Sequence, residues 1–80
     1  MDKSQILVEL TKVMEKLFEV SDLKITEQTI ASDIEEWDSL NHIQLVVAIE
    51  KHFKIKFTAS EIQNWKNVGE IVESISKKLT

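Results

Sequence analysis

The chain has 80 residues and a mass of 9.3 kDa, of which 42% are hydrophobic and 30% are charged. This length supports one domain, and the absence of cysteine excludes disulfides, thiolate metal sites and a thiol nucleophile. The net charge of −4 comes from fourteen acids and ten lysines, and without arginine the chain lacks the concentrated basic surface typical of nucleic-acid binding.

The first predicted element is an amphipathic helix over residues 3–18. Its apolar residues recur three and four positions apart, and lysines and glutamates fill the positions between them. Asp2 or Ser4 is placed to cap its start. Because the polar face carries both charge signs, we expect this helix to pack in a bundle and not to lie on a membrane surface.

Residues 20–38 show no sustained period and are interpreted as a long loop with room for one short turn of helix. A loop of this length inside a small domain is often functional. Its apolar residues are expected to pin it to the core: Val20, Leu23, Ile25, Ile30, Ile34 and Trp37. The stretch from Glu27 to Asp38 holds five acids and no lysine, which is typical of a solvated loop or of a docking surface for basic partners.

A second helix is predicted over residues 39–53, with Asp38 at the N-cap position. Its expected buried stripe comprises Leu40, Ile43, Val46, Val47, Ile49 and Phe53, with Leu45 beside it. Residues 54–57 alternate like a strand but are too few to stand alone. We interpret them as an extended connection.

Two capping signals predict the remaining helices. Thr58 and Glu61 match a capping box that opens a short helix near 59–65, with Trp65 as a half-buried lid over the helix junction. Asn67 and Glu70 repeat the pattern before a final helix near 68–79. The apolar stripe of that helix is Val68, Ile71, Val72, Ile75 and Leu79. The expected fold is therefore all-α, with three main helices, one short helix and a long first loop.

The junction Glu35-Glu36-Trp37-Asp38-Ser39-Leu40 carries the candidate chemistry. Ser39 would be the first residue of the second helix, beside unpaired backbone N–H groups and the positive end of the helix dipole. A phosphate ester on its hydroxyl would be stabilised there. Taken alone, however, the pair Asp38 and Ser39 before an apolar helix is more typical of ordinary capping.

The motif Asp38-Ser39-Leu40, placed behind a long loop at the start of the second of four helices, resembles the attachment site of the acyl carrier protein family. The resemblance covers nearly the whole chain and implies a four-helix acyl-carrier-like bundle. It also implies a covalent 4'-phosphopantetheine arm, which a phosphopantetheinyl transferase moves from coenzyme A to Ser39. The arm would carry acyl groups as thioesters between the loading and transferring enzymes of fatty-acid, polyketide or related biosynthesis.

The same resemblance assigns further site residues. Asp38 corresponds to the acid before the modified serine, and Leu40 to the apolar residue after it, which is typically used in partner docking. The outer face of the second helix would contact partner enzymes through Asn41, Gln44, Val47 and Glu50.

The chain also departs from carriers of primary fatty-acid synthesis. Those carriers usually have glycine and a small residue where this chain has Glu36 and Trp37, and they carry a run of acids along the second helix. These departures favour a carrier dedicated to one pathway, with Trp37 as an anchor of the loop over the core. An aminoacyl or peptidyl carrier of the same fold is the alternative within the family.

Two alternative functions lie outside the family. Asp38, Ser39 and His42 have the residue types of a catalytic triad, but no glycine-rich turn supplies an oxyanion hole and the chain is small for a substrate cavity. We therefore expect no catalytic residues and an exposed His42. A helical protein-interaction adaptor without a prosthetic group is also compatible with the sequence, and Ser39 would then be only a cap.

The remaining expectations concern the whole chain. We expect a single carrier domain over residues 1–80, without a metal site and not itself an enzyme. No apolar run is long enough to span a membrane, and acids and lysines interrupt the N-terminal apolar residues that a signal peptide would need. The expected protein is therefore a cytoplasmic monomer that neither inserts into membranes nor binds nucleic acid.

Overall fold

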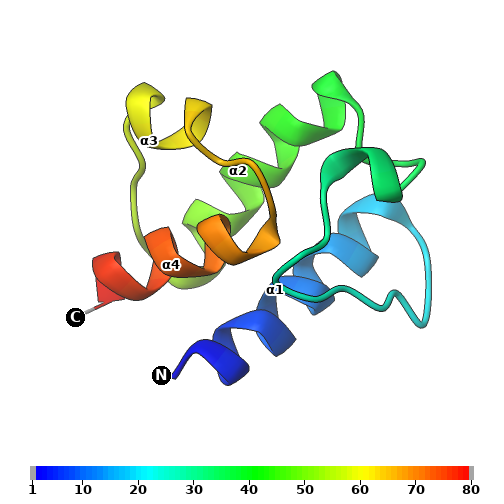
Figure 1. Cartoon of the computed structure of the whole chain (residues 1–80), viewed down its shortest axis with the longest axis horizontal. Helices are drawn as coiled ribbons and strands as arrows, with labels where there is room; N and C mark the ends of the chain where they lie inside the picture. The colour runs from blue at the N-terminus through cyan, green and yellow to red at the C-terminus, as the bar shows by residue number, and fades with distance from the viewer. Residues whose placement is uncertain (1, 80) are drawn as a thin grey trace.

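The computed structural model describes residues 2–79 and shows three main helices with two short helical turns. In chain order these are α1 (Lys3–Phe18), the 3-10 turn η1 (Ala31–Asp33), α2 (Ser39–Phe53), α3 (Ala59–Gln63) and α4 (Val68–Leu79). The described residues contain no strand. Helix α1 packs against both α2 and α4, while α3 lies at the edge of the bundle and the long loop with η1 joins α1 to α2 (Figure 1). The expected all-α bundle is confirmed.

Side-chain caps begin all four helices where the sequence predicts them. Asp2 forms a capping box at the start of α1, and Thr58 forms another at the start of α3. Asp38 accepts a hydrogen bond from a backbone N–H of α2, and Asn67 does the same for α4. The bounds of α1, α2 and α4 agree with the prediction, whereas α3 ends two residues earlier than expected. Capping depends only on neighbouring residues, which is why the helix starts could be predicted.

The core is a single apolar cluster between the three main helices and the loop. No polar or charged residue among residues 2–79 is buried, so the interior depends on side-chain packing. Burying each large side chain contributes about 1.5–3 kcal/mol. The buried members of the cluster are Ile6, Leu10, Met14, Phe18, Ile25, Ile34, Trp37, Leu45, Ile49, Phe53, Val68, Ile71, Val72 and Ile75. Within this described part of the chain, no helix is both long and apolar enough to cross a membrane.

The buried stripe expected for α2 is wrong at three positions. Leu40, Ile43 and Val47 are 66%, 64% and 44% exposed, whereas Leu45 is completely buried. Apolar residues occupy a wide arc of this helix, so their period alone does not identify the part that faces the core. Contact with α1 and with the rest of the bundle decides it, and one apolar row of α2 is left on the surface. Leu79 of α4 is also more exposed than expected, at 38%.

The long loop is held against α4 by two backbone hydrogen bonds. The N–H of Val68 donates to the carbonyl of Thr29 at 2.8 Å, and the N–H of Gly69 donates to the carbonyl of Glu27 at 2.8 Å. These bonds satisfy two of the N–H groups that the first turn of α4 cannot pair internally. Of the loop residues expected to anchor it, three are buried, namely Ile25, Ile34 and Trp37.

Candidate functional site

Ser39 is the first residue of α2 and its side chain is exposed. The preceding Asp38 has extended backbone angles, and its carboxylate accepts a hydrogen bond from the N–H of Asn41 at 2.8 Å. That bond turns the Asp38 carboxylate toward the helix end. Among residues 2–79, the Ser39 hydroxyl has no hydrogen-bond partner, so it is available for reaction.

The first turn of α2 offers unpaired donors next to this hydroxyl. The N–H of His42 bonds to the carbonyl of Asp38 at 2.8 Å, and the N–H of Asn41 is taken by the Asp38 side chain. The N–H groups of Ser39 and Leu40 have no partner within the described chain. Together with the positive end of the helix dipole, they favour a negatively charged group on Ser39.

Trp37 anchors the loop immediately before the site, as the sequence predicts. Its side chain is only 7% exposed, and its backbone N–H donates to the carbonyl of Ile34 at 3.1 Å. The indole Nε1–H donates to Nδ1 of His42 at 3.0 Å, and the two rings stack with centroids 6.0 Å apart. The indole therefore joins the end of the loop to the first turn of α2 across the Asp38–Ser39 step.

The expectation of an exposed His42 is wrong, because the ring is half-buried between two tryptophans. Trp37 stacks on it, and Trp65 meets it edge-on with centroids 6.1 Å apart. Burial lowers the pKa of His42, which favours the neutral imidazole. Trp65 is half-buried as expected, and its Nε1–H donates to Oγ of Ser74 at 2.8 Å. The sequence did not indicate the contact with Trp65, because Trp65 lies 23 positions from His42. It did not indicate the contact with Trp37 either, because Trp37 precedes α2 and helical spacing does not apply to it.

The arrangement is not a catalytic triad. The Asp38 carboxylate bonds to the backbone of Asn41, and Nδ1 of His42 accepts from Trp37. Neither group bonds to the Ser39 hydroxyl within residues 2–79.

An open pocket of about 480 Å³ lies beside the serine. It is lined by Ala31 of η1, by Trp37 and Asp38, and by Ser39 and His42 of α2. A group attached to Ser39 therefore emerges next to the rings of Trp37 and His42 and the carboxylate of Asp38.

The four residues that the family resemblance assigns to partner docking lie in two different environments. Gln44 and Val47 are exposed on the outer side of α2. The side chain of Asn41 is half-buried, and its Nδ2 donates to the carbonyl of Glu36 at 2.7 Å, which ties the loop to the helix. Exposed Leu40 and Ile43 adjoin Val47 at helical spacing, so the outer surface of α2 is mainly apolar.

Glu50, the fourth of these residues, supports the chain after α2. Its carboxylate is half-buried and accepts the N–H of Phe57 at 2.9 Å. Glu50 is also the single acid between Ser39 and Phe53. The outer side of α2 consequently offers no acidic side chain that is free of an internal hydrogen bond.

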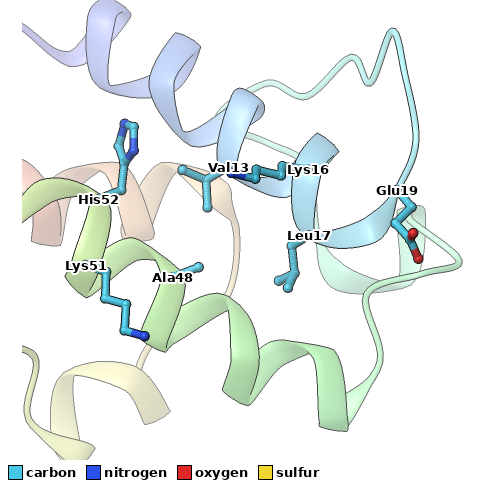
Figure 2. A pocket seen from close by; sticks show the side chains of 7 residues that line it. All are labelled: Val13, Lys16, Leu17, Glu19, Ala48, Lys51 and His52. Carbon is cyan, nitrogen blue, oxygen red and sulfur yellow. The ribbon is translucent and has the colours of Figure 1, made fainter.

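A second open pocket, of about 590 Å³, lies between α1 and the C-terminal half of α2 (Figure 2). Its lining residues are Val13, Lys16, Leu17, Glu19, Ala48, Lys51 and His52. His52 points across it toward α1, where its Nε2 lies 2.9 Å from Oε1 of Glu9. Ala48 is nine residues beyond Ser39, or about 14 Å along the helix axis, so this pocket is separate from the candidate site.

Comparisons with known proteins agree with the motif and the fold. The sequence model for the phosphopantetheine attachment site matches residues 8–75. An acyl carrier protein homolog of Mycoplasmopsis pulmonis is 33% identical over 76 residues, which cover 95% of this chain and 93% of that protein. An acyl carrier protein of Acidothermus cellulolyticus is 26% identical over 76 residues, covering 95% and 90%.

Among solved structures, the holo acyl carrier protein of Geobacter metallireducens is similar with a TM-score of 0.87. It is 42% identical in sequence, and the match covers 92% of this chain and 85% of that one.

Proposed function

Because the chain belongs to the acyl carrier protein family, we propose that Ser39 carries its prosthetic group and that the surface around Ser39 meets the partner enzymes. The protein is a carrier that holds acyl intermediates as thioesters on covalent 4'-phosphopantetheine, and its partners are a phosphopantetheinyl transferase and acyl-handling enzymes. The match over residues 8–75 supports our further proposal that residues 1–80 form one carrier domain.

The observation that carries the assignment is the state of the Ser39 hydroxyl. It is exposed, it has no partner among the described residues, and it lies beside two unpaired backbone N–H groups at the start of α2. A phosphodiester has only hydrogen-bond acceptors and a negative charge, so these residues fit the group. Asp38 supports the arrangement by capping α2 through Asn41, which leaves the serine unobstructed.

The transfer reaction that we propose uses this exposed hydroxyl. Oγ of Ser39 attacks the phosphorus of coenzyme A that bears the pantetheine, a new P–O bond forms, and the bond to the departing nucleotide phosphate breaks. The hydroxyl proton goes to a base on the transferase, because no base of this chain bonds to Ser39 among residues 2–79. The bound group then supplies a terminal thiol, which the cysteine-free chain lacks.

The test is an intact mass measurement after incubation with coenzyme A and a promiscuous phosphopantetheinyl transferase. We expect one added phosphopantetheine on the wild-type protein and on Ser32→Ala, a control change at an exposed serine of the loop before α2. We expect none on Ser39→Ala. A folded wild-type protein that gains no mass, or a Ser39→Ala variant that does, would contradict the assignment.

The surface of α2 supports a second part of the proposal, namely that the partner docks on an apolar row and belongs to a dedicated pathway. Leu40, Ile43 and Val47 lie exposed at helical spacing, with Gln44 beside them. The one acid of the helix, Glu50, is already hydrogen-bonded to Phe57. A partner that selects carriers by an acidic helix would find little to bind here, whereas an apolar partner patch fits.

An aminoacyl or peptidyl group is the alternative cargo, because it would use the same arm. The mass of the thioester on protein isolated from its own cells distinguishes the two. We also propose that the protein is not itself a catalyst and that it works as a cytoplasmic monomer. Light scattering during size-exclusion chromatography tests the oligomeric state, and a dimer would contradict it.

A further inference from the structure

His42 lines the same pocket as Ser39, and the proposed carrier function has so far assigned it no role. The two residues are three positions apart, which places them on one side of the helix, and both line the pocket of about 480 Å³. No lysine lines this pocket, and none occurs between Lys24 and Lys51. The imidazole is therefore the side chain beside Ser39 best suited to bind an anion.

Trp37 determines which nitrogen of this imidazole carries the proton. The indole N–H can only donate, so Nδ1 of His42 must accept its 3.0 Å hydrogen bond. In the neutral ring the single proton is then on Nε2. The ring stacking of Trp37 on His42 and the edge contact from Trp65 hold the imidazole in this orientation.

The remaining nitrogen is open to the outside of the protein. Nε2 of His42 has no hydrogen-bond partner among residues 2–79. In that part of the chain, every fully buried side-chain nitrogen or oxygen has a partner, so Nε2 is not fully buried. Nε2 is therefore in contact with solvent. It is a donor whose direction is determined by the ring contacts and which does not yet bind another group of the protein.

We propose that His42 donates a hydrogen bond from Nε2 to the phosphodiester carried on Ser39, and that Trp37 is the positioning residue that sets the tautomer. The inference rests on the proposed attachment at Ser39. The phosphodiester offers only acceptors, and the N–H groups of Ser39 and Leu40 bind it from the helix side. The imidazole would bind it from the pocket side, so that the root of the arm is held between the helix end and the ring.

The charges around the ring allow this contact to be measured. In the unmodified protein, burial lowers the pKa of His42. The acids nearest to it along the chain are Asp38, which lines the same pocket, and Glu36 in the half-buried end of the loop, while Trp65 on the other side is uncharged. Asp38 and Glu36 are present before and after modification. A change in the pKa of His42 on modification therefore reports the phosphodiester on Ser39.

The experiment compares apo and holo protein by nitrogen-15 and proton NMR of the histidine rings across a pH series. Intact mass first establishes that the holo sample is modified, so a failure of the Ser39 assignment is recognised separately. We expect a neutral Nε2–H tautomer in both forms and a rise in the pKa of His42 of about half a unit or more in the holo form. The internal control is His52 at the other end of α2, whose ring contacts Glu9 of α1 and whose NMR signals should be the same in the apo and holo forms. An unchanged pKa of His42, or an Nδ1–H tautomer, would overturn the proposal.

Phosphorus NMR of the holo protein provides the reciprocal measurement. The phosphodiester resonance should follow the titration of His42 in the wild-type protein, and this step should be absent in His42→Phe but kept in His52→Phe. A step that persists in His42→Phe contradicts the contact. The Trp37→Phe variant keeps an aromatic ring at this position but loses the indole N–H that donates to Nδ1 of His42. Both neutral tautomers of His42 should then be populated. If only the Nε2–H form remains, Trp37 has no positioning role.

Discussion

Replacing Gly69 of α4 by alanine tests the fold, because the added methyl group has two opposing effects on stability. It favours the helix, and it collides with the long loop. Replacing glycine by alanine inside a helix usually stabilises it by about 0.5–1 kcal/mol. At this position, however, a Cβ would lie 2.9 Å from the carbonyl oxygen of Glu27 and 3.1 Å from its Cβ. The nearest atom belongs to the backbone of the loop, so it cannot rotate away as the end of a flexible side chain would.

Relieving this contact moves the loop away from α4. The Glu27 carbonyl accepts the N–H of Gly69 at 2.8 Å, and Thr29 accepts the N–H of Val68 at 2.8 Å beside it. Losing a backbone hydrogen bond so that its donor is left unpaired costs about 1–3 kcal/mol. This cost exceeds the gain in helix propensity. We therefore expect Gly69→Ala to lower the free energy of unfolding by about 1–2 kcal/mol.

Urea denaturation followed by far-ultraviolet circular dichroism measures the change, which corresponds to a fall in Tm of about 4–8 °C for each kcal/mol in a domain of this size. Ser76→Ala in the same helix is the matched control, because it gains helix propensity without the contact and should not destabilise the protein. A Gly69→Ala variant as stable as the wild type, or more stable, would refute the reasoning that the loop is held tightly against α4.

Three further predictions concern the core, the surface and the pH dependence. Met14 is completely buried, so Met14→Ala should lower the free energy of unfolding by about 2–5 kcal/mol in the same urea assay, and a loss below 1 kcal/mol would contradict its place in the core. Ile43 is 64% exposed, so Ile43→Ser should change stability by less than about 0.5 kcal/mol. It should nevertheless reduce the kcat/KM of phosphopantetheine transfer several-fold, whereas the control Val8→Ser on α1 should not, and equal rates for both variants would exclude Ile43 from docking. The pKa of Glu61 lies below its ordinary value of 4.5, chiefly because its carboxylate accepts the N–H of Thr58. Between the folded and unfolded pKa values, the unfolded state binds more protons than the folded state. This contribution to stability is therefore present above pH 4.5 and is lost as the pH falls through the pKa of the folded state. When the urea midpoint is measured from about pH 3 to 6, Glu61→Gln should show a smaller loss of stability at acid pH than the wild type.

Helix positions could be predicted from the sequence because their signals are local. Asp38 and Thr58 each accept a hydrogen bond from a backbone N–H three residues ahead, so both partners of the cap lie within four consecutive residues. The same holds for the candidate site, since Ser39 was recognised from its immediate neighbours and its place in the order of helices. The role of Trp37 as a loop anchor was predictable for a similar reason, because a large apolar side chain in a polar loop is stabilised by burial.

The side of α2 that faces the core could not be predicted in the same way. Leu40 and Leu45 are both apolar, yet the first is exposed and the second is buried. A helix with apolar residues over a wide arc can pack in more than one orientation. The orientation of α2 depends on its packing against α1 and the rest of the core. Asn41 and Glu50 were likewise assigned to an outer face, whereas their side chains bond to the chain's own backbone.

The sequence by itself therefore determined the all-α class, the helix starts and the serine motif, because capping, periodicity and motif order depend on residues close together in the chain. Only the tertiary structure decided that α2 leaves an apolar row exposed, and that His42 lies between Trp37 and Trp65 beside Ser39. Trp65 is distant from His42 in sequence, and Trp37 precedes α2 and follows no helical period. The three rings meet only when the loop, α2 and the segment after α3 pack together, and the exposed row of α2 depends on the same packing.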